Sequence, residues 1–165
     1  MAIVIMFKTL AGATSRKLGG KTLRKGFNGS RCTGKPSFIR DTGKLVIAAV
    51  GGSCVGGGNE LVLVCDLVCD IKICEILTAG SDSWVNRYWW RRTDMPIAIG
   101  EKRAKELLLP AKFLTADQAY EWGLVNRVVE DSKLEDEAGK MALEVIEKSS
   151  PQAFRVIKLC IKLLG

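Results

Sequence analysis

The sequence predicts an α/β fold, and three features of the chain support this class. The run Leu45–Val50 is short, apolar and rich in β-branched residues, which is typical of a buried strand. A glycine cluster, Gly56–Gly58, follows it and leads into the apolar segment Leu61–Cys65, which favours the order strand, loop, helix. The valines of that segment also suit a strand. After residue 100, the chain shows repeated helical patterns.

Length and composition fit one globular domain over residues 1–165, which is long enough to bury a hydrophobic core. Apolar residues make up 47% and charged residues 26%, which argues against wholesale disorder. The chain has 25 basic and 18 acidic residues, a net charge of +7, and no histidine. Without histidine, no Ser-His-Asp or Cys-His triad and no imidazole base can form within the chain. Proton transfer must therefore use carboxylates, Tyr, Lys, Cys or water.

The six cysteines are too sparse for a disulfide scaffold, and their spacing does not match a zinc site. We expect no metal site, and small buried thiols in a reducing compartment, at Cys32, Cys54, Cys65, Cys69, Cys74 and Cys160. The N-terminal apolar run is too short to span a membrane, and it lacks the leading positive charge of a secretory signal. These features predict a cytoplasmic protein without a membrane partner.

Basic residues gather between Arg16 and Lys44, where nine of them accompany one acid, Asp41, and six glycines. This composition predicts a mobile basic loop or a poorly formed helix. Such a segment is either a solvated surface or an anion-binding surface, and charge alone does not decide between them.

Two consecutive helices are predicted in the C-terminal half. The first has a helical spacing of charges and leucines over Glu101–Leu109 and is stopped by Pro110. The second begins with the capping-box pattern Thr115–Gln118, and we expect it to end at Gly123. The next residues, Leu124–Val129, are typical of a short strand.

Two longer helices are predicted after that strand. Glu135–Lys148 has an amphipathic pattern. Ser150 and Pro151 place a capping residue before a proline at the first helical position, so we expect a further helix to start here. The apolar residues of this helix include Phe154, Ile157, Ile161 and Leu164.

The glycine cluster before an apolar helix has a chemical use. Without Cβ atoms, a ligand oxygen can approach the backbone closely. The first N–H groups of a helix have no acceptor inside it, and the helix dipole favours negative charge there. The cluster can therefore hold a phosphate or stabilise an oxyanion, although it matches neither a Walker loop nor a dinucleotide-binding fingerprint. On the pattern alone, tight packing without chemistry is an equal alternative.

Three segments resemble the enoyl-CoA hydratase/isomerase (crotonase) superfamily, in the order of that family. Leu45–Asp66 contains IAAVGGSCVGGGNELVLVCD, which is similar to the family's strand, glycine cluster and apolar helix ending in Cys-Asp. Gly100–Glu130, GEKRAKELLLPAKFLTADQAYEWGLVNRVVE, and the helix start Ser150–Pro151 resemble it as well. The resemblance implies a crotonase-like ββα superhelix with C-terminal helices. Because family members are commonly longer, we expect the family's first strands and last helices to be missing.

The N-terminus also resembles this family. Leu10–Ala13 followed by Ser15–Leu18 is similar to its first active-site loop, and Ala2–Met6 would be the strand that feeds the loop. In the family, this loop and the middle glycine of the cluster supply two main-chain N–H groups that hold the thioester oxygen. The resemblance therefore implies Ala13 and Gly57 as the donors to a developing enolate.

The same resemblance implies that Glu60 orients water or transfers protons, as a glutamate at this position does in family hydratases. The substrate site would also include Gly56, Gly58, Ala11, Gly12 and Gly80. Family hydratases use a second Glu whose position falls near Gly80, and the nearest glutamate here is Glu75. A glycine at this position resembles naphthoyl-CoA synthases or ring-opening oxo-cyclohexene-carbonyl-CoA hydrolases instead. We expect Asp66 and Asp70 to end or cap the helix.

The segment Ser83–Arg92, SWVNRYWWRR, departs from the glycine-rich loop that the family has at this place. A local disturbance of the reading frame in the coding sequence would produce foreign residues while preserving the length. The alternative is a genuine aromatic and basic loop, whose Arg and Trp side chains could stack on bases.

The resemblance implies acyl-CoA thioester chemistry of the enoyl-CoA hydratase/isomerase type. It implies coenzyme A as part of the substrate, no separate cofactor, and a homo-oligomer, either a trimer or a hexamer. Two alternatives stay open. The missing second Glu and the altered loop favour a catalytically impaired or non-catalytic member, and the basic charge leaves a nucleic-acid-binding module as the third hypothesis.

Overall fold

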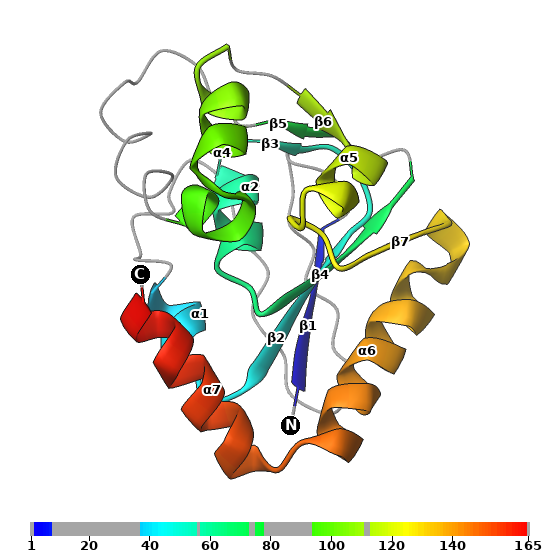
Figure 1. Cartoon of the computed structure of the whole chain (residues 1–165). Coiled ribbons are helices and arrows are strands. Elements are labelled where there is room, and N and C mark those ends of the chain that lie inside the picture. The colour runs from blue at the N-terminus through cyan, green and yellow to red at the C-terminus, as the bar shows by residue number, and fades with distance from the viewer. Residues whose placement is uncertain are drawn as a thin grey trace.

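The computed structural model describes residues 2–7, 37–55, 57–72, 75–77, 94–110 and 113–164, which form two small sheets with helices around them (Figure 1). The larger sheet contains four parallel strands in the order β1 (Ala2–Phe7), β2 (Leu45–Val50), β4 (Leu67–Ile71) and β7 (Arg127–Val129). The smaller sheet contains β3 (Cys54–Val55), β5 (Glu75–Leu77) and β6 (Phe113–Thr115). Strands β3 and β5 are parallel, and β5 and β6 are antiparallel. The predicted α/β class is confirmed.

Strand β2 lies at the centre of the larger sheet, and all six of its side chains are buried. A parallel strand that is covered on both faces requires a continuous apolar run, which Leu45–Val50 supplies. The strand predicted at the N-terminus is also present. It pairs with β2 in register, from Ala2 opposite Leu45 to Phe7 opposite Val50. The carboxyl ends of β1 and β2 therefore meet at the same edge of the sheet.

The apolar segment after the glycine cluster is a helix, α2 (Gly57–Leu63), and the chain then turns into β4. Asp66 joins this turn to β2, because its Oδ2 accepts the N–H of Val46 at 2.7 Å and its own N–H donates to the Val46 carbonyl at 2.9 Å. The expected place of Asp70 at a helix end is wrong. Asp70 is a fully buried residue of β4, since the apolar run that resumes after Asp66 forms a third strand of the sheet.

Helices α4 (Glu101–Leu108) and α5 (Ala116–Glu121) occur where the sequence predicts them. The capping box of α5 is formed: the Thr115 hydroxyl accepts the Gln118 N–H at 3.2 Å, and the Gln118 side chain accepts the Thr115 N–H at 3.1 Å. The helix ends before Gly123, whose φ of 81° lies in the left-handed region. The strand that follows is shorter than predicted, because the N–H groups of Leu124 and Val125 both donate to the Ala119 carbonyl.

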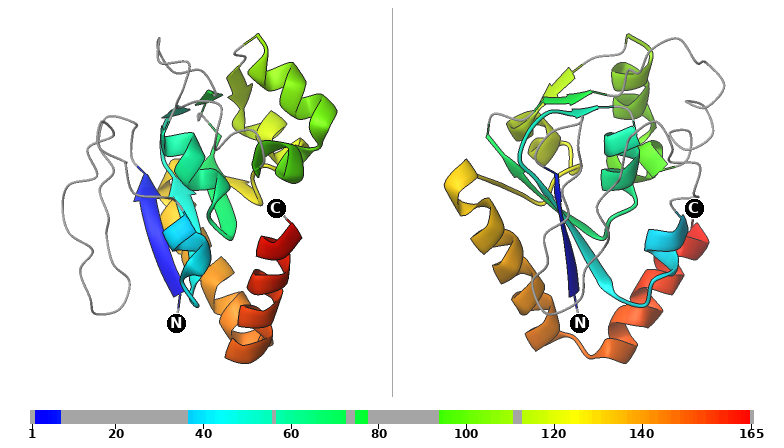
Figure 2. Two further views of the ribbon diagram at one scale, coloured as in Figure 1. Left: turned by 90° about the vertical axis from the view of Figure 1, so that its left-hand side faces the viewer. Right: turned by 180° about the vertical axis from the view of Figure 1, so that it is seen from behind.

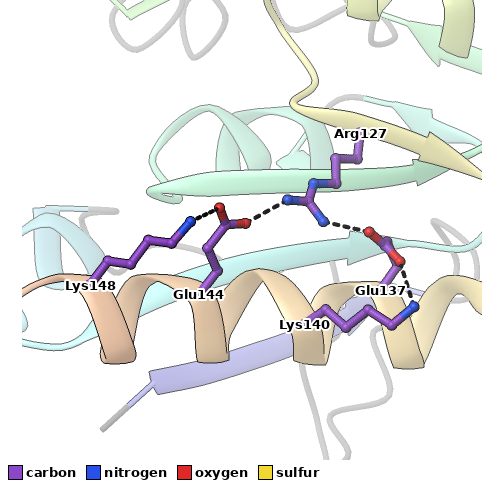
Figure 3. Close-up of polar contacts among 5 residues, drawn as sticks. All are labelled: Arg127, Glu137, Lys140, Glu144 and Lys148. Atoms are coloured by element: carbon purple, nitrogen blue, oxygen red, sulfur yellow. Dashed lines mark hydrogen bonds and ion pairs between the residues drawn. The ribbon is translucent and has the colours of Figure 1, made fainter.

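Helix α6 (Leu134–Lys148) packs against the larger sheet and follows a short 3₁₀ turn at Asp131–Lys133. It is joined to β7 by the Arg127 guanidinium, which lies between the carboxylates of Glu137 and Glu144 (Figure 3). The Arg127 hydrogen bond holds the pKa of Glu137 below its usual value. Lys148 and then Arg127 lower the pKa of Glu144 in the same way.

Helix α7 (Pro151–Leu164) begins as predicted, with the Ser150 hydroxyl accepting the Ala153 N–H at 3.2 Å. Two views place it beside α1 (Ser37–Asp41), the helix in the described part of the basic stretch (Figures 1 and 2). Phe154 of α7 packs against the hydrophobic core, and two ion pairs add to this contact: the Lys158 ammonium donates to Asp66 at 2.8 Å, and Lys162 pairs with Asp41 of α1. Several large apolar side chains of α7 are exposed, namely Val156, Ile157, Leu159, Ile161 and Leu163.

The described cysteines differ in burial. Cys54 and Cys69 are buried and Cys65 is partly buried, as expected. Cys160 is exposed, contrary to the expectation, because α7 presents this position to solvent. Cys32 and Cys74 lie outside the described residues. Within the described ranges, no helix has the length and apolar content needed to cross a membrane.

Candidate active site

Strands β1 and β2 end at the same edge of the sheet, and α2 begins at Gly57, seven residues after β2 ends at Val50. After Val50 the chain passes through Gly51–Ser53 and β3, and α2 then begins at Gly57. In open α/β sheets, ligands bind outside the carboxyl ends of parallel strands, at the positions where the connecting loops begin. The local order is strand β2, a turn, strand β3 and the start of α2, so the predicted order of strand, loop and helix is present, and anion binding here stays a prediction.

Gly57 is the first residue of α2, so its N–H belongs to the first turn, whose donors have no acceptor within the helix. Gly58 is the second residue and is partly exposed. The backbone of Glu60 follows Gly57 by three residues in the same helix, which is about one turn. Helix α2 therefore brings together three of the predicted site residues, Gly57, Gly58 and Glu60.

The remaining predicted site residues lie outside the described part of the chain: Ala11, Gly12, Ala13, Gly56 and Gly80. The same holds for the altered segment Ser83–Arg92 and its suspected disturbance of the reading frame. The strand before the first predicted loop is described and ends at Phe7.

Two buried polar side chains near this edge are absent from the sequence-based set of site residues. Asn59 of α2 is fully buried, and within the described part of the chain neither its Oδ1 nor its Nδ2 has a hydrogen-bond partner. Leaving such a group without a partner costs about 1–3 kcal/mol. Asp70 pairs with Val50 across the strands, and its Oδ1 accepts the N–H of Ile71 at 2.8 Å. For Asp70, the sequence signal is a polar residue inside an otherwise apolar segment, whereas Asn59 lies between Gly58 and Glu60 and has no such signal.

The thiols near this edge are unsuited to nucleophilic chemistry. Burial raises the pKa of Cys54 to about 12, and the negative charge of Asp70 acts in the same direction. Burial likewise raises the pKa of Cys65 to about 12 and that of Cys69 to about 11. Because a thiolate is the reactive form, these three cysteines stay protonated and inert at neutral pH. The described residues also contain no cluster of three metal-binding side chains.

Solved structures define the class of fold to which this arrangement belongs. An enoyl-CoA hydratase from Mycobacterium marinum superposes with a TM-score of 0.70 at 28% identity, covering 76% of this chain and 64% of that one. A monofunctional enoyl CoA isomerase from M. smegmatis gives a TM-score of 0.69 at 29% identity, with 76% and 59% covered. The described residues thus form part of a crotonase-type fold.

The sequence comparison gives the family. The family model for enoyl-CoA hydratase/isomerase matches residues 25–162, and the chain belongs to this family. A 4-chlorobenzoyl coenzyme A dehalogenase from Arthrobacter sp is 34% identical over 102 residues, which are 62% of this chain and 37% of that protein. A 1,4-dihydroxy-2-naphthoyl-CoA synthase from Mycobacterium tuberculosis is 32% identical over 128 residues, or 77% and 40%. The chain spans about two fifths of the length of these curated relatives.

Proposed function

We propose that this chain contributes the glycine-helix part of an acyl-CoA thioester site. Its main-chain N–H groups would hold the thioester oxygen while that oxygen gains negative charge. The observation that supports this most directly is the start of α2 at Gly57, seven residues after β2 ends at Val50, in a chain of the enoyl-CoA hydratase/isomerase family. The relatives named above process coenzyme A thioesters according to their names, which supports the same substrate class.

The chemistry follows from the charge that develops during the reaction. Removal of an α-proton, or attack of water on a β-carbon, converts the thioester into an enolate and places negative charge on its oxygen. Two fixed N–H donors stabilise that charge more than the neutral carbonyl, and losing one donor costs about 10²–10³ in kcat in other enzymes. Gly57 would be one donor, and Ala13 would be the second.

Glu60 is the group that we assign to proton transfer or to orienting water. It lies one helical turn after Gly57, and the chain has no histidine to take this role. Burial raises the pKa of the Cys54, Cys65 and Cys69 thiols and keeps them protonated, so we favour a carboxylate for this role. Coenzyme A would enter as part of the substrate, and we propose no separate cofactor.

The decisive experiment offers the protein a panel of acyl-CoA thioesters, starting with crotonyl-CoA, and follows the products by mass spectrometry. Hydration adds the mass of water, isomerisation leaves the mass unchanged, and hydrolysis releases free coenzyme A. The variant Gly57→Pro removes the N–H donor, while proline is tolerated at the first position of a helix. We expect kcat/KM to fall about 10²–10³-fold for Gly57→Pro and about 10²–10⁴-fold for Glu60→Gln.

Gly139→Ala is the matched control, because a Cβ at this α6 position meets no atom within 4 Å. It should leave turnover unchanged. Circular dichroism and thermal unfolding establish that each variant is folded. Normal turnover by a folded Gly57→Pro variant would overturn the role of this amide. Retention of wild-type protein on coenzyme A-agarose without turnover of any thioester would favour the second candidate function, a non-catalytic member of the family.

The second candidate rests on a specific observation. The position near Gly80, where family hydratases carry their second Glu, holds a glycine, and Glu75 is the nearest glutamate. A site with one carboxylate cannot perform two-carboxylate acid/base hydration. It suits either a reaction that needs one proton-transfer group or a binding role without turnover.

We further propose that the protein acts as a homo-oligomer, a trimer or a hexamer. The exposed apolar side chains of α7 support this proposal, because an exposed helix face of this kind is typical of a surface that another chain covers. Light scattering coupled to size exclusion measures the assembly directly. A monomer at all concentrations would contradict this part of the proposal.

A further inference from the structure

A small cleft lies between α1 and α7, two helices that Figures 1 and 2 place side by side. Its volume is about 200 Å³. We call it the basic cleft and define it by Arg40, Asp41, Gly43, Arg155, Lys158 and Lys162. Four of these residues are cations and one is a carboxylate; Asp66 and Asp94 pair with two of the cations, so an excess of one positive charge remains. It lies outside the candidate active site.

Arg155 has unused binding capacity. Among the described residues, its guanidinium has no ion-pair partner, although the side chain carries five N–H donors. It lies close to the backbone of Gly43, where an added Cβ would come within 3.2 Å of its Nε. A glycine at position 43 therefore leaves the guanidinium room to lie against the wall of the cleft.

The other cations of the basic cleft are held in place by their own partners. Arg40 pairs with Asp94, and Lys162 pairs with Asp41. The Lys158 side chain is only 9% exposed, and its ammonium donates to Asp66 at 2.8 Å and to the Lys44 carbonyl at 3.1 Å. Because an ammonium has three N–H donors, one donor of Lys158 remains beyond these two contacts. The charges are thus fixed in position before any ligand arrives.

We propose that the basic cleft binds a small phosphate-bearing compound, separately from the thioester. Guanidinium and ammonium groups are the side chains that proteins use to hold phosphate oxygens, and the planar guanidinium does so with paired hydrogen bonds. Pockets for drug-sized ligands measure about 300–1,000 Å³, so a cleft of about 200 Å³ suits a phosphate or diphosphate group rather than a large organic molecule. The anion would pair with Arg155, the cation of the cleft that has no ion-pair partner among the described residues.

The position of the basic cleft separates it from the glycine cluster. Gly43 precedes β2, whereas Gly57 follows it, so the two sites lie toward opposite ends of this strand. A strand of six residues spans about 20 Å. A ligand in the basic cleft would contact both α1 and α7 and would therefore stabilise their association by mass action.

Isothermal titration with inorganic pyrophosphate, at constant ionic strength near that of the cell, tests the proposal. We expect saturable binding, and a loss of affinity of about tenfold in Arg155→Gln, since one charge-assisted contact is removed. The matched control is Arg103→Gln, which removes the same charge from α4 outside the basic cleft. It should change the affinity less than twofold. Pyrophosphate should also slow hydrogen exchange in α7 of the wild type.

Three results would overturn the proposal. The first is the absence of saturable binding to the folded wild type at millimolar pyrophosphate. The second is equal weakening by Arg155→Gln and Arg103→Gln, which would indicate unspecific attraction to a basic protein. The third is displacement of pyrophosphate by coenzyme A together with a raised KM for the thioester in Arg155→Gln, which would assign the basic cleft to the thioester's own phosphates. A failure of the proposed catalytic function would appear instead in Gly57→Pro and Glu60→Gln.

Discussion

Strand β2 and helix α7 are both rich in apolar residues, but the burial of their side chains differs. Every side chain of β2 is buried, whereas Ile157 and Leu163 of α7 are 56% and 77% exposed. Pairing with β1 and β4 holds β2 within the sheet, while α7 contacts the rest of the chain through the Lys158–Asp66 and Lys162–Asp41 ion pairs and through Phe154, which packs against the core. Apolar content alone therefore does not determine burial. The sheet depends on apolar packing, whereas the attachment of α7 combines ion pairs with the packing of Phe154.

The largest expected effect comes from removing apolar volume in the sheet. Ile47 is fully buried, so Ile47→Ala should lower the free energy of unfolding by about 2–5 kcal/mol. Ile157→Ala on α7 is the matched control and should change it by less than about 0.5 kcal/mol. Urea denaturation of the two variants measures the difference. Equal losses would show that α7 is packed as tightly as the sheet.

The next effect comes from Asp66, which connects the two regions. It accepts the Val46 N–H in the sheet and pairs with Lys158 of α7, and its side chain is 18% exposed. Asp66→Ala removes both contacts and should lower the free energy of unfolding by about 1–3 kcal/mol. Lys158→Met removes only the contact with α7, so it should release α7 while leaving β2 protected. Hydrogen exchange of both elements distinguishes these outcomes.

A smaller effect is expected where α6 meets β7. Arg127→Gln removes the hydrogen bonds that help lower the pKa of Glu137 and Glu144, and the melting temperature should fall by a few degrees at pH 7. Because both carboxyl groups have a lowered pKa in the folded state, their contribution is present above the usual value of 4.5 and is lost as the pH falls through the folded values. The difference between wild type and variant should shrink below about pH 4.5, as thermal melts across this range would show. A constant difference would contradict the linkage.

The smallest expected effect is that of salt. Raising the ionic strength from about 0.05 to 0.5 M shortens the screening length and weakens exposed ion pairs more than buried contacts. Exchange of α7 amides should accelerate, because Lys162 and Asp41 are 43% and 49% exposed, while exchange of β2 amides should stay unchanged. Potassium chloride and sodium chloride should act alike. Equal acceleration of both elements would indicate global destabilisation instead.

The sequence predicted the elements whose signals are local. The capping box at Thr115, the helix start at Pro151 and the buried run Leu45–Val50 were each confirmed, because hydrogen-bonding side chains, proline geometry and burial act within a few residues. The position of Asp70 was not predicted, because its burial depends on pairing with β2, which lies 20 residues earlier. The start of the predicted strand was wrong because Leu124 and Val125 complete the end of α5.

The candidate site was predictable to a smaller extent. Gly57, Gly58 and Glu60 lie on one helix, as predicted, since strand, glycines and helix are close together in the chain. Whether the chemistry assigned to them operates stays a prediction, as do the roles of Ala13 and Gly80. The buried amide of Asn59 and the basic cleft could not be predicted. Predicting the burial of Asn59 requires knowledge of what surrounds α2. The basic cleft is lined by residues that are far apart in the sequence, such as Gly43 and Arg155, which more than half of the chain separates.

The in-register pairing of β1 with β2 also has a practical consequence for engineering. The meeting point of their carboxyl ends is set by strand pairing and not by the number of residues between Phe7 and Leu45. Doubling the length of a flexible connection raises its closure free energy by only about 0.6 kcal/mol. A change in the length of this connection beyond the segment that carries Ala13 should therefore leave the register of β1 and β2 unchanged, which makes that part of the junction the natural place to build libraries for altered selectivity.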